Sequence, residues 1–344
     1  CSFDLKWFYN GIPVKTLTYY NYLGILFSTR LSWTRCTYTL VGKASKALYS
    51  LKALFKRFPN MPTSVMFRLF DCKIKPVLLY GSEIWGFKER KAVEVFHTNF
   101  CKFTLGVGKH VSSNGILADC GRTNIYVDYH IRCVSYWCKL LRMSEDRYPK
   151  QCYLLMQRLD SVGRVTWATS VKYLLNSYGF GFVWLCQDVG NISLFLSLFK
   201  NRIIDCNKQC IMGKISESVQ LKYFKEVKSL LNVEYYVSSI NDIVIRRNIC
   251  LLRLHVLPLK CNIRDKTIDK TCRMCDSGLL EDEIHFMFVC KAYASIRNTY
   301  LSCNGSDHVM LKYYKLITSN CKSTLSKCCR FIKEAMAMRR VVSS

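Results

Sequence analysis

The chain has 344 residues, with 51 lysines and arginines against 24 aspartates and glutamates, so its formal net charge is +27. Half of the residues are hydrophobic and 13% are aromatic, which excludes a disordered basic tail. The 16 glycines and 6 prolines are too few for a collagen or a low-complexity linker. The composition indicates a packed protein whose excess positive charge points to a polyanion, most often nucleic acid and less often an acidic membrane surface.

The chain starts at Cys1 rather than at a methionine, and we expect a fragment that begins partway through a longer open reading frame. No run of about 18 uncharged apolar residues occurs, so the sequence predicts no membrane span. Twenty cysteines are spread along the chain. Because no secretory signal is recognised, we expect most of them to be small buried hydrophobes in a reducing compartment.

The first thirty or so residues are expected to form short strands. Asn10-Gly11 separates the aromatic run Phe3–Tyr9 from Ile12–Leu17, which predicts a hairpin with a type I′ turn. A third short strand is expected at Tyr22–Phe27, in which Gly24 permits a close backbone approach or forms a bulge.

A long stretch near the start of the chain lacks carboxylates. No acidic residue lies between Asp4 and Asp71, and the stretch contains ten basic ones: Lys6, Lys15, Arg30, Arg35, Lys43, Lys46, Lys52, Lys56, Arg57 and Arg68. These charges repel one another unless a partner supplies negative charge. The alternative is a basic face that is simply solvated.

The hydrophobic period becomes helical from Trp33 onward. Apolar residues recur every three or four positions over Ala44–Phe58, with lysines between them, and Pro59 and Pro62 end this helix and start another. Pro76 and Gly81 are expected to interrupt the chain again.

Further helices are predicted along the rest of the chain. Amphipathic patterns fit Lys91–Leu105 and Tyr126–Met143, and a polar turn at Ser144–Pro149 suggests a boundary. Helical signals from 150 to 250 are weaker, for example at Lys222–Leu231. The predicted fold class is therefore mainly α with a small N-terminal β region.

One cluster has the spacing of a metal site. Cys272 and Cys275 form a CxxC pair, and His285 and Cys290 follow after nine and four further residues. Two thiolates on one turn can share a tetrahedral Zn²⁺, and His285 and Cys290 would complete a Cys3His set. Four protein ligands leave no open position, so the predicted zinc is structural.

A redox pair and coincidence stay open as alternatives to a zinc site. A CxxC can be a redox dithiol, although the βαβ context of such motifs is missing here. Twenty cysteines can also produce this spacing by chance, and Cys261 is a possible substitute ligand. Asp276, Glu281, Asp282 and Glu283 make the segment locally acidic, which disfavours phosphate contact and favours base contact or an architectural role.

No catalytic centre is visible in the sequence. Two-metal chemistry needs clustered carboxylates, whereas the acidic residues here are scattered and no Asp-Asp pair occurs. A phosphate-binding glycine loop and a serine nucleophile elbow are also missing. The remaining histidines are expected to be structural or superficial: His97, His110, His130, His255 and His308.

Several segments resemble the C-terminal half of the reverse transcriptase of non-LTR (LINE-type, jockey-like) retrotransposons, and they follow one another along the chain in the same order as in that family. The most specific are Pro76–Gly86 (PVLLYGSEIWG) and the Cys/His cluster. The others are Phe8–Gly11, Tyr22–Ile25, Leu69–Asp71, His97–Lys102 and Asp119–Arg122. The resemblance covers nearly the whole chain and is weaker from about 150 to 245.

The resemblance implies five segments: palm-end and primer-grip strands (1–32), a thumb-like helical domain (33–148), a helical connector (149–245), a zinc-binding segment (246–300) and a C-terminal helical tail (301–344). It implies that the chain grips template RNA and primer DNA. The implied contact residues are Tyr22, Leu23, Gly24, Arg30, Arg35, Lys43, Lys46, Lys52, Lys56 and Arg57. The implied location is a cytoplasmic ribonucleoprotein, the nucleus, or both.

The chain departs from the family pattern in three respects, one of which is Leu254–Pro258 (LHVLP), which differs from the common pattern before the zinc-binding segment. The catalytic [FY]xDD palm motif, which would hold Mg²⁺, is absent, and Asp119 replaces a usual glutamate. We therefore expect an RNA-directed DNA polymerase fragment that cannot polymerise by itself. The alternative is a domesticated, non-enzymatic zinc-containing protein that binds RNA or other proteins.

Overall fold

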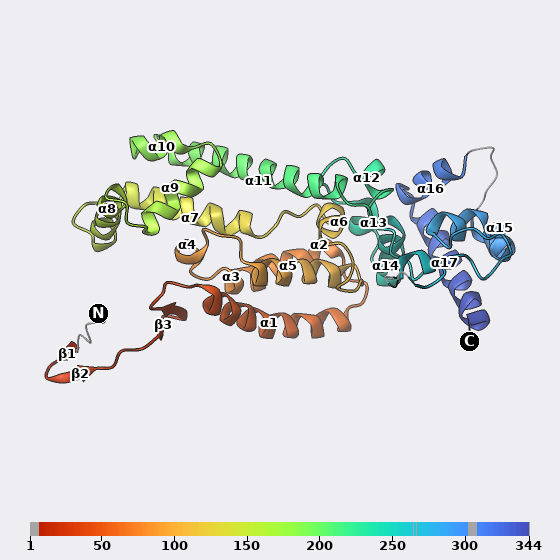
Figure 1. Cartoon of the computed structure of the whole chain (residues 1–344), viewed down its shortest axis with the longest axis horizontal. Coiled ribbons are helices and arrows are strands. Elements are labelled where there is room, and N and C mark those ends of the chain that lie inside the picture. Colours follow the sequence, from red (N-terminus) through yellow and green to blue (C-terminus); the bar gives the residue numbers. More distant parts are fainter. Residues whose placement is uncertain (1–6, 264, 266, 302–307, 344) are drawn as a thin grey trace.

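The computed structural model describes residues 7–263, 265, 267–301 and 308–343. The molecule is mainly helical, with two small antiparallel strand pairs at its N-terminal end, as the hydrophobic patterns predict. It is elongated, and the long helices α1 (Thr34–Arg57) and α11 (Ile192–Ser216) follow opposite long edges (Figure 1). Among the described helices, none is long and apolar enough to cross a membrane.

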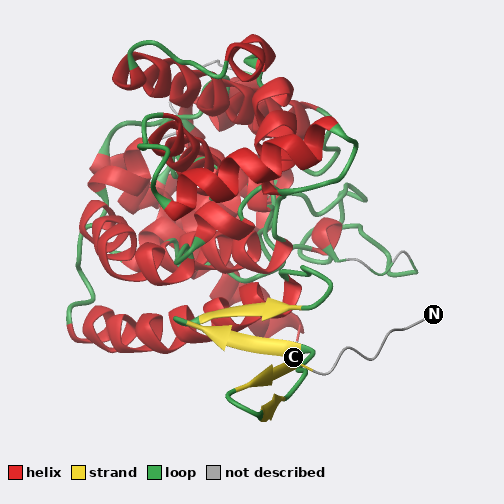
Figure 2. Cartoon of the chain, turned by 90° about the vertical axis from the view of Figure 1, so that its left-hand side faces the viewer, coloured by secondary structure: helices red, strands yellow, loops and turns green. Residues whose placement is uncertain are grey.

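The N-terminal strands form two hairpins rather than one hairpin and a lone strand. β1 (Trp7–Tyr9) pairs with β2 (Ile12–Val14) across the predicted Asn10-Gly11 turn, whereas Phe3 lies outside the described residues. β3 (Tyr19–Tyr22) pairs with β4 (Ile25–Ser28), beside the helices in Figure 2. The expected strand Tyr22–Phe27 is confirmed only over Ile25–Phe27, because Leu23 and Gly24 have φ of +47° and +85° and form the turn between β3 and β4.

The first helical group packs around one hydrophobic cluster that runs from Ile25 to Tyr129. The predicted helix ending before Pro59 is confirmed as α1, and the group continues with α2 (Thr63–Leu69), the π-helix η1 (Phe70–Ile74), α3 (Lys75–Leu78), α4 (Ser82–Trp85) and α5 (Lys91–Thr104).

Pro76 does not interrupt the chain as expected. It is the second residue of α3, directly after the π turn in which Lys75 N–H reaches the Phe70 carbonyl, and a proline is tolerated in the first turn of a helix. The break comes at Gly81, whose φ is +65° and where a Cβ would lie 2.6 Å from Ile25 Cδ1. This contact fastens the second hairpin to the helices.

A second cluster is formed by α7 (Tyr126–Leu141), α8 (Tyr148–Ser161), α9 (Trp167–Ser177), α10 (Gly181–Cys186) and the first half of α11. The predicted helices Lys91–Leu105 and Tyr126–Met143 are therefore confirmed to within two residues at their ends. α7 contributes to the first two clusters, with Tyr129 in one and Cys133 in the other. The five predicted segments stay predictions, because shared packing does not show which parts fold independently.

The third cluster joins the middle of the chain to its C-terminal part. The expected helix Lys222–Leu231 shrinks to the single turn α12. The elements are α6 (Ser113–Asp119), α12 (Phe224–Val227), α13 (Tyr235–Ser239), α14 (Ile243–Arg253), η2 (Lys260–Asn262), η3 (His285–Val289), η4 (Lys291–Tyr293), α15 (Ala294–Tyr300), α16 (Val309–Ile317) and α17 (Lys322–Ser343).

The segments that carry the family resemblance meet in these cores. The Arg122 guanidinium donates two hydrogen bonds to the Asp71 carboxylate, at 2.6 and 3.0 Å, and its Nε lies 3.1 Å from His97 Nε2. The Asp119 carboxylate is fully buried and accepts two hydrogen bonds from the Arg253 guanidinium, both 3.0 Å long. The motif residues therefore hold helices together across long sequence separations.

The cysteines match their expected role in part. The eighteen cysteines that the structure describes are all unbridged, and ten of them are buried. Five are exposed: Cys72, Cys152, Cys186, Cys210 and Cys321.

Candidate metal centre and basic helix face

The CxxC pair lies at the end of a short β-hairpin. Thr271 and Leu280 form an isolated antiparallel bridge, and Cys272 N–H donates to the Leu279 carbonyl at 2.8 Å. Met274 N–H lies 3.4 Å from Cys272 Sγ. This tight turn brings the two thiols of the pair to one side of the hairpin.

His285 and Cys290 come from the π-helix η3. Cys290 N–H donates to the His285 carbonyl at 2.8 Å, which closes a ring five residues long. Such a wide turn places residues five apart above one another, whereas an α-helix would turn them well apart. Asp282 caps the start of this turn, because its Oδ1 accepts the His285 N–H at 2.8 Å.

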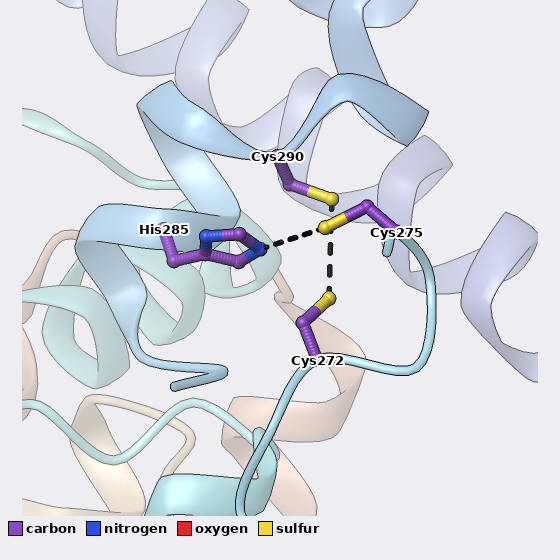
Figure 3. A group of neighbouring side chains, drawn as sticks. All are labelled: Cys272, Cys275, His285 and Cys290. Carbon is purple, nitrogen blue, oxygen red and sulfur yellow. Dashed lines mark hydrogen bonds between the residues drawn. The ribbon is translucent and has the colours of Figure 1, made fainter. Parts of the chain in front are cut away.

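The four side chains converge as a metal site requires (Figure 3). Their ligand atoms all lie within 4.8 Å of one another. Cys272 and Cys290 Sγ are 3.9 Å apart, and Cys275 Sγ is 3.4 Å from His285 Nε2. Tetrahedral zinc with Zn–S of about 2.3 Å and Zn–N of about 2.0 Å requires roughly 3.8 and 3.5 Å for these distances. The predicted ligand set therefore fits Zn²⁺.

Burial shapes the protonation of these ligands. It raises the pKa of Cys272, raises that of Cys290 to about 12, and lowers that of His285. A hydrogen bond from Ser277 lowers the pKa of Cys275. His285 is therefore neutral, as a metal ligand must be, and the two buried thiols need a bound cation to ionise near neutral pH.

The surroundings are less acidic than the sequence suggests. Glu281 and Glu283 are 2% and 0% exposed. Glu281 forms a bidentate pair with Arg339 at 2.7 and 2.8 Å, and Glu283 contacts His255 Nδ1. We call the segment that carries the four ligands, residues 270–290, the metal module. The two glutamates link it to the rest of the chain, so they are not part of its surface. The expected acidic surface is therefore reduced to Asp276 and Asp282.

Cys261 and Arg297 lie close to the candidate metal centre but are not part of the ligand set. Cys261, the possible substitute ligand, is not in the cluster, and its Sγ lies 3.9 Å from Glu283 Oε2. Arg297 donates to the carbonyls of Met287 and Cys290 at 2.8 and 2.7 Å and so fixes the end of η3. Sequence reasoning missed Arg297, because nothing in its local pattern points to this contact.

The basic side chains of α1 divide into two sets. Arg35, Lys46 and Arg57 are spaced by eleven residues, close to three helical turns, and so lie in one row along the helix. All three are exposed, as is Lys56. The row is about 33 Å long, roughly ten base pairs of a duplex at 3.4 Å each. Lys56 directly precedes Arg57 and lies about 100° around the helix from it, at one side of this line. We call the three residues of the line together with Lys56 the basic row.

The second set consists of Lys43 and Lys52, which are both engaged within the protein. Lys43 Nζ donates to the Gly24 carbonyl at 3.3 Å, and Lys52 Nζ lies 4.8 Å above the Phe103 ring.

In the row, Arg35 and Arg57 also lie 4.6 and 5.9 Å from the Tyr19 and Phe58 rings, whereas Lys46 and Lys56 make no such contact with the described residues. Within the described part of residues 7–70, no lysine or arginine forms an ion pair. The charge of the basic row is therefore not compensated by an ion pair with the described residues.

The other predicted contact residues lie next to the start of α1. Tyr22 and Leu23 are 57% and 72% exposed at the turn of the second hairpin. Tyr80 OH donates to the Leu23 carbonyl at 3.0 Å, which fixes this turn on the helices. Arg30 is exposed in the loop after β4, and Arg35 lies 4.6 Å above the Tyr19 ring.

Two aromatic residues beside the row were not singled out from the sequence. Tyr38 and Tyr49 are 63% and 79% exposed. They are also eleven residues apart, so they form a second row next to the cations. This shared spacing is the signal that could have identified them.

Within the described part of the chain, the Cys272/Cys275/His285/Cys290 group is the one set of side chains placed to hold a metal ion. Comparisons with protein-family models, with curated proteins and with solved structures find no match.

Proposed function

We propose that this chain is a nucleic-acid-binding fragment of a retrotransposon RNA-directed DNA polymerase, one that grips template RNA and primer DNA but lacks a catalytic palm. The observation that supports nucleic-acid binding is the basic row on α1. A helix that is cationic along about 33 Å and has no carboxylate matches a phosphate backbone in charge and in length. The assignment to a retrotransposon rests on the sequence resemblance alone.

The row suits contact without sequence readout. Exposed lysines and arginines bind phosphates and position a duplex, whereas base reading requires groups that enter a groove. Tyr38 and Tyr49 add aromatic surface beside the cations. Lys56 and Arg57 also stabilise the C-terminal end of α1 through its dipole, so their presence alone would not identify a binding face.

The metal centre has a structural part in this proposal. Three thiolates and one imidazole would occupy every position of a tetrahedral Zn²⁺, which would stabilise the hairpin and η3 without exposing the ion to a substrate. In this proposal, Mg²⁺ would belong to a catalytic palm.

The test is the salt dependence of binding to an RNA–DNA duplex. Each neutralised phosphate adds about 0.9 to the slope of log affinity against log salt. We expect the double variant Lys46→Gln/Lys56→Gln to lower this slope by about two units. Lys43→Gln/Lys52→Gln removes the same charge from the same helix, but from side chains that are already engaged, and should lower it by less than about half as much.

A salt-independent affinity, or equal effects of the two double variants, would reject the basic row as a phosphate contact. A chain that binds no nucleic acid at all would favour the alternative of a zinc-containing protein-interaction module.

A further inference from the structure

A groove of about 830 Å³ lies beside the metal centre. Its walls come from five separate parts of the chain: His110, residues 219–222, residues 255–263, residues 270–282 with the CxxC hairpin, and α17. The groove is therefore formed only when these parts pack together. Its volume lies in the range of about 300–1,000 Å³ that is typical of ligand sites.

The groove combines an apolar floor with a cationic rim. Val256 and Leu257 are buried in the floor. Lys222 and Lys270 lie on the rim, and Lys222 Nζ also lies 4.4 Å above the Tyr223 ring, a contact that a bound phosphate would have to replace or share. Asp282 is the single carboxylate among the lining residues that the structure describes, and its Oδ1 is already used by the His285 N–H. The lining is therefore suited to a ligand with an anionic group and an apolar planar part.

His255 in the wall of the groove has an unusual environment. Its φ is +58°, a conformation that is costly for a residue with a side chain. Its ring stacks on Tyr223 at 4.6 Å, and its Nδ1 faces Glu283. Its Nε2 is buried with no hydrogen-bond partner among the described residues. Strain and an unsatisfied buried atom at the same residue are features of binding sites more than of passive cores.

We propose that this groove binds one nucleoside phosphate, with the phosphate at Lys222 and Lys270 and the base on the apolar floor next to His255. Cationic grooves with apolar or aromatic platforms bind unpaired nucleotides in this way. The inference rests on the proposed nucleic-acid binding and adds a site for an unpaired nucleotide, separate from the duplex contact on α1. The same phosphate and base chemistry is offered by a free nucleotide and by a single strand.

The CxxC hairpin supplies Lys270 and Leu280 to this groove. Because the metal centre holds that hairpin, binding in the groove should also require the bound metal, whereas binding on α1 should not.

The test uses the full chain with its metal and two probes, a fluorescein-labelled ten-residue oligo(A) RNA and ATP. The variant Lys222→Glu/Lys270→Glu should weaken oligo(A) binding by about tenfold or more, because it replaces two cations that attract the phosphate by two anions that repel it. The matched control Lys291→Glu/Lys327→Glu reverses two exposed lysines outside the groove and should change it by less than about threefold. Metal content measured by mass spectrometry confirms that both variants keep an intact module.

ATP competition identifies the source of the ligand. If ATP displaces oligo(A) from the unaltered chain, the groove accepts free nucleotides as well as strands; if it does not, a strand is required. Unchanged oligo(A) affinity in the Lys222/Lys270 variant overturns the groove proposal. RNA–DNA duplex affinity measured on the same variant tests the basic row separately, so the two proposals can fail independently.

Discussion

The basic row on α1 and the metal module handle charge in opposite ways. Arg35, Lys46, Lys56 and Arg57 face solvent, and no lysine or arginine in the described residues 7–70 forms an ion pair. Around the metal centre, Glu281 and Glu283 are buried against Arg339 and His255. The net charge of +27 therefore does not describe how charges are arranged, because those in the two regions have different surroundings. The charges near the metal centre are paired inside the fold, whereas those on α1 stay exposed to solvent.

The largest test of this contrast removes a metal ligand. Cys275→Ser should abolish the binding of one zinc ion per chain and unfold the hairpin and η3, because structural zinc contributes about 10 kcal/mol or more to such modules. Zinc content by mass spectrometry and urea unfolding measure the two effects. Cys261→Ser is the control and should keep the zinc, because its thiol lies outside the cluster. Zinc loss in both variants, or in neither, would contradict the ligand set.

The next largest effect concerns a buried ion pair. Asp119→Ala removes the bidentate partner of Arg253, which is 1% exposed and keeps only Glu234, at 3.3 Å, as an acidic partner among the described residues. This should lower the free energy of unfolding by about 3 kcal/mol, because a buried charge loses most of its compensation. Asp205→Ala breaks an exposed pair with Lys208 and should cost less than about 1 kcal/mol. Similar losses in urea unfolding would show that burial does not separate the two pairs.

The buried side chain of His130 allows a test of whether folding keeps an imidazole neutral. Burial lowers the pKa of His130 from 6.5 to about 4, and its Nδ1 lies 3.2 Å from Tyr178 OH. Between pH 6.5 and 4 the unfolded chain therefore binds the proton more tightly, and stability falls as the pH falls.

Between pH 7 and 5 this group alone should remove about 2 kcal/mol from the free energy of unfolding. His130→Gln should remove that part of the pH dependence, and the comparison of the two pH profiles cancels acid effects on the metal centre. Parallel profiles would mean that His130 does not titrate in this way.

The smallest effect on stability is expected on α1. Lys46 is exposed and forms no hydrogen bond or ion pair with the described residues, so Lys46→Gln should change the free energy of unfolding by less than about 0.5 kcal/mol. The same substitution should weaken nucleic-acid binding. A marked loss of stability would show that the row supports the fold and would weaken the contrast between the two regions.

Local sequence signals determined much of the secondary structure. The three- and four-residue apolar period identified α1, α5 and α7, and Asn10-Gly11 identified the first hairpin. Both signals depend only on neighbouring residues. The second hairpin was missed because Leu23, an ordinary strand residue, adopts the positive φ of a turn. The ligand set was also readable, since CxxC spacing reflects a single tight turn.

Tertiary structure alone decided how the remaining charges are used. In the sequence, Asp119 stands alone and Glu281 belongs to a locally acidic segment, yet their partners are distant: Arg253 lies 134 positions from Asp119 and Arg339 lies 58 from Glu281. Such pairs form only when the chain brings distant helices together, and desolvation then makes each partner indispensable to the other. The composition thus determined that positive charge is in excess, and folding decided that the part on α1 stays exposed.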